Sequence, residues 1–177
     1  TGADVAVAII IVDDIFVSEA KGSHAVAKLM HTQLERRYGK GEVKIQHEPD
    51  SFAGYTILRD RSRRALTLTM ASVIEAAARE HVPAYVAGAT RAEMGLPTGK
   101  RMQVLSDGMR LPPPAERAPK LSAQQRTVRT MLGKLRWYEK VTPALTHQVH
   151  NLSCVATYPP PEAEVIARVA MCDAYDR

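Results

Sequence analysis

The chain has 177 residues, 45% of them hydrophobic, and a formal net charge of +5. This is enough for one well-packed core with a smaller appendage, and it is only modestly basic. The two cysteines lack CxxC spacing, so neither a disulfide framework nor a zinc ribbon is expected. The expected location is therefore intracellular, in the cytoplasm or nucleus. The apolar run at residues 5–12 is too short to span a bilayer and ends in charge, so no membrane partner is expected.

The N-terminal stretch is predicted to form a strand hairpin followed by a helix. Residues 5–12 (VAVAIIIV) and 15–17 (IFV) are rich in branched apolar side chains, which is typical of two paired strands. Within residues 23–38 apolar side chains recur at every fourth position, which indicates one face of a helix, with Ser23 as its N-cap. Gly39 is expected to end this helix.

Further strands and a helix are predicted next. The expected strands cover residues 43–46, 52–58 and 65–69. The charged sequence RDRSRR forms the expected turn between the last two of them, where it is either an ordinary solvated turn or an unspecific contact for phosphate. A helix is predicted over residues 71–81, before Pro83.

Residues 83–121 differ in composition from the rest of the chain. They contain four glycines and six prolines, which predicts a largely irregular linker. Three helices are predicted beyond it, from Ser122 to about Lys140, after Pro143 to about Tyr158, and after Pro161 towards Tyr175. The predicted class is α+β, with a strand-rich domain at 1–82, a linker at 83–121 and a helical domain at 122–177.

Two adjacent acidic residues, Asp13 and Asp14, interrupt the apolar hairpin. In the middle of a strand they would point to opposite faces, but at a hairpin tip both can face one cleft. Carboxylates are preferred ligands of Mg²⁺, and two such ions can stabilise the entering and leaving oxygens of a phosphoryl transfer. The alternative is an ordinary polar hairpin tip without a metal.

An apolar strand, the sequence Val-Asp-Asp and a second apolar strand resemble the catalytic hairpin of reverse transcriptases of copia-type retrotransposons and retroviruses. The sequence Phe-Ala-Gly-Tyr at 52–55 is similar to the primer-grip strand pair of that family. The resemblance implies that Asp13 and Asp14 bind two Mg²⁺ ions and that Phe52, Gly54 and Tyr55 hold the primer 3′ end. Core packing is the alternative for Phe52 and Tyr55. Where the family has an aromatic residue, two positions before the first aspartate, this chain has Ile11.

The predicted helix at 122–140 has two distinct faces. Apolar residues expected to face the core are Val128, Met131, Leu132 and Leu135. The opposite face carries Arg126, Arg129, Gly133, Trp137 and Lys140. Cations beside an aromatic plane suit a sugar-phosphate surface, and a helical glycine, which costs about 1 kcal/mol relative to alanine, suggests close approach by a partner. The alternative is that Trp137 packs against another helix or domain and that the arginines only solubilise the chain.

The sequence LGKLRW within this helix also resembles the thumb helix of retroviral reverse transcriptases. In that family, residues spaced four apart on this helix follow the minor groove of the primer–template duplex. The matching positions are Arg129, Gly133 and Trp137. The resemblance implies the C-terminal part of a polymerase palm followed by a helical thumb.

The expected parent protein is an RNA-directed DNA polymerase. Its partners would be an RNA–DNA or DNA primer–template duplex, deoxynucleoside triphosphates, and an upstream fingers and palm half that supplies a third carboxylate ligand. Without that half the chain is expected to be inactive. Two alternatives remain: a non-catalytic relative that binds nucleic acid or scaffolds a ribonucleoprotein, and an unrelated protein–protein module.

A weaker pattern lies on the second C-terminal helix. His147, His150 and Cys154 share one face of that helix, opposite an apolar stripe. Their spacing could bind zinc, but a fourth ligand is not evident, and a polar or interface face is the alternative.

Overall fold

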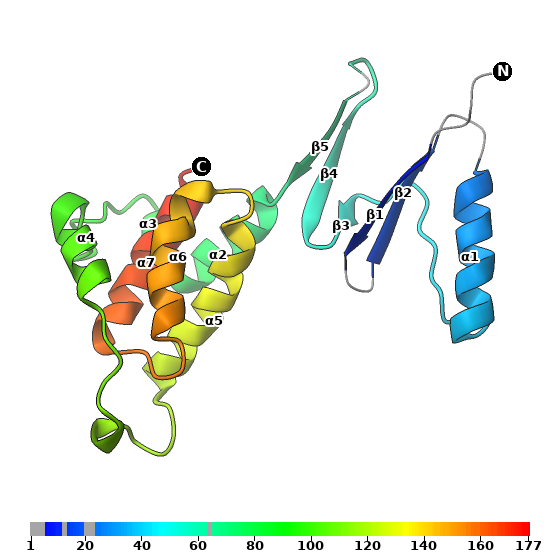
Figure 1. Ribbon diagram of the computed structural model, residues 1–177. Coiled ribbons are helices and arrows are strands. Elements are labelled where there is room, and N and C mark those ends of the chain that lie inside the picture. Colours follow the sequence, from blue (N-terminus) through cyan, green and yellow to red (C-terminus); the bar gives the residue numbers. More distant parts are fainter. Residues whose placement is uncertain (1–5, 12–13, 20–23, 64) are drawn as a thin grey trace. The chain divides into compact units, whose positions relative to one another are not determined.

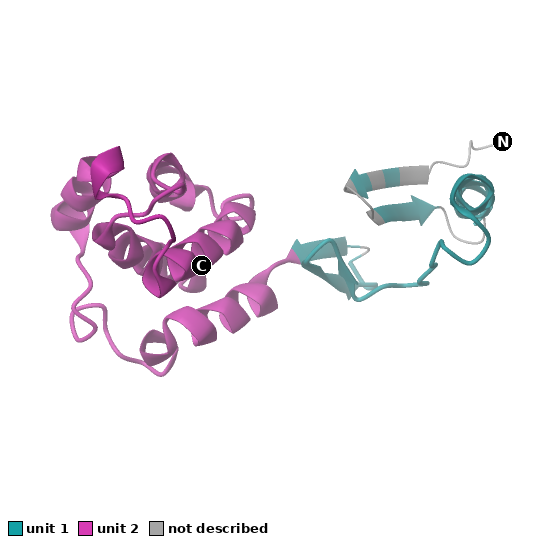
Figure 2. Cartoon of the chain, turned by 90° about the horizontal axis from the view of Figure 1, so that it is seen from below, with its two compact units in different colours: residues 1–68 teal, residues 69–177 magenta. Residues whose placement is uncertain are grey.

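A computed structural model describes residues 6–11, 14–19, 24–63 and 65–177. The chain divides into two compact units, residues 1–68 and residues 69–177 (Figures 1 and 2). The described residues form seven α-helices, two short 3₁₀ helices, a two-stranded sheet and a three-stranded sheet. The predicted α+β class is therefore confirmed.

The first unit begins with the predicted hairpin. Strands β1 (Ala6–Ile11) and β2 (Asp14–Glu19) pair antiparallel, with Ile11 opposite Asp14. Helix α1 (Ala25–Tyr38) follows, and the Glu19 carboxylate accepts a hydrogen bond from the backbone N–H of Ala27 in its first turn. Such a bond satisfies one of the donors that every helix leaves free at its start. Ser23, the predicted N-cap, lies outside the described residues.

The second sheet of this unit differs in two places from the prediction. Residues 43–46 form no strand, and the expected single strand at 52–58 is a tight hairpin of β3 (Ser51–Phe52) and β4 (Tyr55–Asp60). The two residues between these strands, Ala53 and Gly54, have φ angles of 47° and 82°. Positive φ at both central positions is what a type I′ hairpin turn requires. The alternation of apolar residues does not indicate this turn, because the alternating pattern of β3 continues through the turn into β4.

Strand β5 (Ala65–Thr69) completes the three-stranded sheet, in the order β3-β4-β5, and has the predicted bounds. The two sheets of the first unit meet at an aromatic contact, where the ring centroids of Phe16 and Phe52 lie 5.5 Å apart. Among the residues of this unit whose side chains are described, Ile57 is the one buried hydrophobic residue, whereas Ile10 is 66% exposed. These described side chains thus form little core.

The second unit is a helical bundle built around its last helix. Its elements are α2 (Ala71–His81), α3 (Pro83–Val86), α4 (Gly99–Gly108), η1 (Pro114–Glu116), α5 (Ala123–Tyr138), η2 (Pro143–Leu145), α6 (Thr146–Cys154) and α7 (Pro161–Tyr175). Helix α7 packs against α2, α4, α5 and α6. Its buried side chains include Ile166, Val169 and Met171, each of which is at most 2% exposed. Apart from Ile57, the whole described core belongs to this unit.

The predicted linker at 83–121 and the predicted boundary at residue 82 differ from the structure. Helices α3 and α4 form within that stretch, and its Leu96, Met102 and Met109 are buried in the helical bundle. The structure also assigns α2 to the second unit. Glycine and proline separate the short elements here, but the apolar residues between them find a place in the core, which composition alone does not show. No helix among the described residues has the length and apolar character needed to cross a membrane.

Candidate nucleic-acid interface

Helix α5 begins at a capping box, which explains why the sequence starts a helix at this point. The Ser122 hydroxyl accepts a hydrogen bond from the backbone N–H of Gln125 at 3.1 Å, and the Gln125 side chain accepts one from the backbone N–H of Ser122 at 2.9 Å. These two bonds satisfy donors that would otherwise be free. The predicted apolar side of the helix, with Val128, Met131, Leu132 and Leu135, is buried, and Tyr138 is buried as well.

The opposite side of α5 is exposed, also as predicted. This side, called here the basic face, consists of Arg126, Arg129, Gly133 and Trp137 of α5, together with Lys140 in the turn after the helix. Trp137 is 40% exposed, so part of its indole is open to a partner and the rest is covered by the chain. The alternative in which Trp137 packs on another helix or domain stays open.

The side chains of the basic face are arranged around its tryptophan. The Lys140 ammonium nitrogen lies 4.1 Å from the centroid of the Trp137 ring, a cation–π contact. A Cβ added at Gly133 would meet no atom within 4 Å, so the glycine leaves an open strip of backbone in the middle of the face. Packing against the described parts of the chain therefore does not require a glycine at this position.

The cations of the basic face are not neutralised by the described parts of the chain. Arg126 donates a hydrogen bond to the carbonyl oxygen of Leu121 at 2.8 Å, but none of Arg126, Arg129 and Lys140 forms an ion pair with a described acidic residue. By contrast, Arg91 forms two such pairs elsewhere in the same unit. The three cations of the basic face therefore keep their positive charge without a described acidic partner.

Two further cations border the basic face and were missed in the sequence. Arg136 is exposed, and its Nε donates to the Ser153 hydroxyl of α6 at 3.2 Å, so it extends the positive surface towards α6. On the other border the Lys134 ammonium lies 2.6 Å from the Glu80 carboxylate and 3.1 Å from the His81 ring nitrogen of α2. By helical periodicity both residues lie at the margins of the face. Their contacts with α6 and α2 show which of them adds to the positive surface.

The contact at α2 changes the ionisation of its members. Burial lowers the pKa of His81, and the nearby Lys134 charge lowers it further. The hydrogen bond from Lys134 lowers the pKa of Glu80. Near neutral pH the cluster therefore combines a neutral imidazole with an ion pair, and it fixes α5 against α2 on the side of the basic face.

The predicted metal site lies in the first unit and is only partly described. Asp13 lies outside the described residues. Asp14 is the first residue of β2, opposite Ile11, and its side chain is not part of the description. Within the described residues there is no group of three or more His, Cys, Asp or Glu side chains that could hold a metal ion.

The predicted primer-grip residues lie at the β3–β4 hairpin. Phe52 and Tyr55 are half-buried and directly opposite each other, and Gly54 is exposed in the turn between them. Phe52 packs against Phe16 of β2. Core packing, the alternative for Phe52, thus describes at least part of what this ring does, and the same contact joins this hairpin to the one that carries the aspartates.

The polar face of α6 does not assemble a zinc site in the described part of the chain. His147, His150 and Cys154 are exposed as predicted. The His147 ring nitrogen is 2.8 Å from the Asp107 carboxylate, and the Cys154 sulfur is 3.8 Å from the His150 ring nitrogen. His147 therefore interacts with α4, whereas His150 and Cys154 interact with each other.

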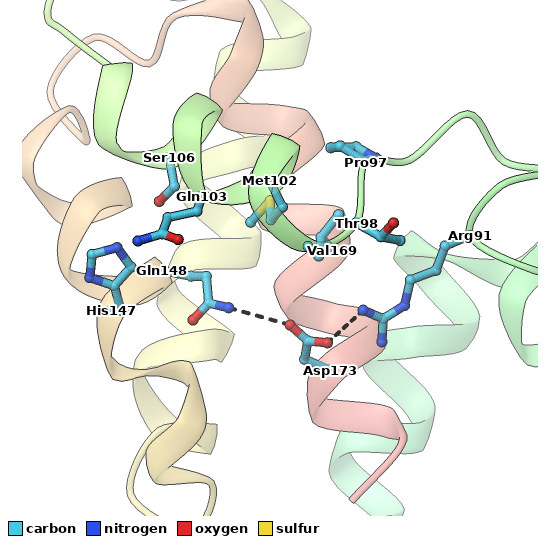
Figure 3. Close-up of a pocket in the computed structure, with 11 residues that line it drawn as sticks. Arg91, Pro97, Thr98, Met102, Gln103, Ser106, His147, Gln148, Val169 and Asp173 are labelled. Carbon is cyan, nitrogen blue, oxygen red and sulfur yellow. Dashed lines mark hydrogen bonds and ion pairs between the residues drawn. The ribbon is translucent and has the colours of Figure 1, made fainter.

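A hollow of about 300 Å³ lies between α4, α6 and α7, with Arg91 and Asp173 at one end (Figure 3). The Arg91 guanidinium pairs with the carboxylates of Asp173 and Asp176, both at 2.7 Å. Burial acts to lower the pKa of Arg91, but hydrogen bonds with Tyr85 and Asp173 outweigh it and raise the pKa above its ordinary value. Arg91 is thus paired with acidic side chains of the same unit, and these ion pairs hold the C-terminal end of α7 against the segment that precedes α4.

Comparisons with known proteins give no relative from which a function could be transferred. No protein family model, no curated protein and no solved structure matches this chain.

Proposed function

We propose that the basic face of α5 binds the sugar-phosphate surface of a nucleic-acid duplex. The observation that carries the proposal is the combination on one exposed helical side: unpaired cations, an exposed tryptophan and a glycine with open space above it. Cations bind phosphate groups without regard to sequence, an aromatic plane stacks on sugars or bases, and bare backbone permits close approach. A helix that is only solvated needs neither the exposed tryptophan nor the glycine.

We further propose that the parent protein is a reverse transcriptase, and that the chain holds the C-terminal part of its palm and a thumb-like helical unit. Support in the first unit comes from the antiparallel pairing of β1 with β2, in which Ile11 is opposite Asp14. The ring of Phe16, two residues after Asp14 on β2, packs on Phe52 of the proposed primer-grip hairpin. This contact between the two hairpins supports the proposal.

The proposed metal ligands are Asp13 and Asp14. Bound Mg²⁺ would supply charge stabilisation to the oxygens of the phosphoryl group transferred to the primer. Phe52, Gly54 and Tyr55 would position the primer 3′ end, and the basic face would bind the duplex. A third carboxylate is proposed to come from outside this chain, so that the chain by itself is expected to be inactive.

A second candidate function is nucleic-acid binding without catalysis, as a domesticated scaffold of a ribonucleoprotein. It is favoured by Ile11, which stands where the reverse transcriptase family has an aromatic residue. The two candidates share the basic face and differ only at the aspartates, so separate experiments on the two units distinguish them.

Binding is tested with the full chain and a labelled RNA–DNA duplex, by fluorescence anisotropy over a range of salt concentrations. The variants are Trp137→Ala and Arg129→Gln, and the matched controls on the exposed surface of α4 are Val104→Ala and Arg101→Gln. We expect Trp137→Ala to cost about 1–3 kcal/mol of binding free energy, and Arg129→Gln to reduce the salt slope by about one. The controls should bind like the wild type. Absence of binding at low salt, or equal losses in the controls, overturns the proposed interface and favours a protein–protein module.

Catalysis is tested by primer extension with the upstream palm half supplied, as the full-length parent or as a second polypeptide. We expect Mg²⁺-dependent extension by the wild type and none by Asp13→Asn, while both bind the duplex equally. Binding without extension in the wild type would support the scaffold function instead. Extension that survives Asp13→Asn would remove the aspartate pair from the mechanism.

A further inference from the structure

We propose that Ser62, at the tip of the β4–β5 hairpin, is a phosphorylation site for an arginine-directed serine/threonine kinase. Arginines stand three residues before, one residue before, and one and two residues after it, in the sequence RDRSRR. Kinases that select basic substrates do so with acidic residues around their substrate groove, so this density of arginine suits them. The inference is independent of the proposed function.

The hydroxyl group of Ser62 is accessible at this tip. Arg61, Ser62 and Arg63 are all exposed, and the two guanidinium-bearing side chains are 77% and 85% exposed. The residues lie in the turn between strands, outside the hydrogen-bonded ladder. Exposed tips of this kind are where modifying enzymes reach a folded chain with least disturbance.

The bonds that hold Ser62 are local and can be replaced. Its hydroxyl donates to the Asp60 carboxylate at 2.6 Å, and the same carboxylate oxygen accepts from the backbone N–H groups of Ser62 and Arg63, both at 3.0 Å. The hydrogen bond from the Ser62 hydroxyl is also the main reason that the pKa of Asp60 is lowered. All three bonds close within four residues, so they can open without unfolding the sheet.

The chain contains a natural comparison in α5. Thr127 and Thr130 each follow an arginine directly and are also exposed. Their hydroxyls, however, donate to the carbonyl oxygens of Ala123 and Arg126, both at 3.2 Å, within a regular helix. A kinase groove that takes an extended or turn segment cannot take these residues without unwinding α5. Arginine in the sequence is common to all three sites, and only Ser62 combines it with an accessible backbone.

In the proposed reaction the Ser62 oxygen attacks the γ-phosphorus of ATP. An oxygen–phosphorus bond forms, the bond from that phosphorus to the β–γ bridging oxygen breaks, ADP leaves with the electron pair, and the hydroxyl proton passes to the kinase. The product carries a charge of about −1.5 to −2 near pH 7. It repels the Asp60 carboxylate and attracts Arg63, which is now 3.6 Å from Asp60, and Arg61, which is now paired with Glu48 at 2.8 Å.

The site is tested by incubating the full chain with Mg-ATP and the catalytic fragment of protein kinase C, followed by peptide mapping by mass spectrometry. We expect a single phosphoryl group on Ser62, complete loss of it in Ser62→Ala, and a several-fold slower reaction in Arg61→Gln, which keeps the acceptor hydroxyl. No incorporation, or incorporation at Thr127 or Thr130 in place of Ser62, overturns the proposal.

A second measurement tests the new contacts of the phosphate. Phosphorus NMR gives the second pKa of phosphorylated Ser62, which is about 6 without partners. We expect a lower pKa in the folded chain than in the chain unfolded by urea, and a return towards the unfolded value in Arg63→Gln. Equal values in the folded and unfolded chains would refute the pairing with arginine.

Discussion

Gly133→Ala separates the stability of α5 from the function of its basic face. Glycine in an exposed helix interior is about 1 kcal/mol less favourable than alanine. The added methyl group meets no atom within 4 Å, so no steric cost offsets this gain. We therefore expect the second unit to become more stable by about 1 kcal/mol, roughly a fivefold rise in the ratio of folded to unfolded protein, and its melting temperature to rise by about 4 °C.

The same methyl group is expected to weaken duplex binding. If the duplex lies against the backbone at position 133, the methyl group occupies contact space, and overpacking typically costs about 1–3 kcal/mol. A loss in the middle of that range raises Kd roughly thirtyfold. A variant that is more stable and binds more weakly is hard to explain by partial unfolding, which would change both properties in the same direction.

The assays are urea unfolding followed by circular dichroism and anisotropy with the RNA–DNA duplex. Gly108→Ala is the matched control, because a Cβ at this last residue of α4 also meets open space and lies away from the basic face. It should leave binding unchanged. A fall in stability on Gly133→Ala would refute the described surroundings of α5, and unchanged binding with raised stability would refute the close approach.

Two further predictions concern the packing of the second unit. Burial and Lys134 lower the pKa of His81 in the folded chain, so the unfolded chain binds more protons at acidic pH. The free energy of unfolding should therefore fall as pH drops from about 7 towards 5. In urea titrations His81→Gln should make that fall smaller, and an unchanged pH profile would contradict the assignment. Arg91→Met should cost about 2–3 kcal/mol of stability, less than a fully buried pair because the guanidinium side chain is 22% exposed, and Arg91→Lys should restore only part of it. Calorimetry showing no change in melting temperature would mean that Asp173 of α7 and Asp176, directly after α7, do not depend on Arg91.

The first unit shows how far local pattern can be read. Branched residues around an acidic pair predicted the β1–β2 hairpin because strand propensity and turn position are encoded within a few residues. The same reasoning failed at Ala53–Gly54, since an alanine at positive φ is not a usual turn signal and the apolar alternation runs through the turn. The strand expected at 43–46 failed as well, because a strand needs a neighbour that local sequence does not specify.

The second unit separates what periodicity decides from what packing decides. The sequence by itself determined α2, α5 and α7, and which side of α5 is buried, because helical periodicity and the Ser122 cap act within one or two turns. Only the tertiary structure decided that α4 and the residues around it join the bundle, and that Arg91 pairs with two carboxylates at the C-terminal end of α7. It also decided that Lys134 pairs with Glu80 of α2, while the cations of the basic face have no acidic partner in the described parts of the chain. These outcomes depend on contacts between residues far apart in the chain, and the free energy of such a contact depends on a distance and a degree of burial that exist only after folding.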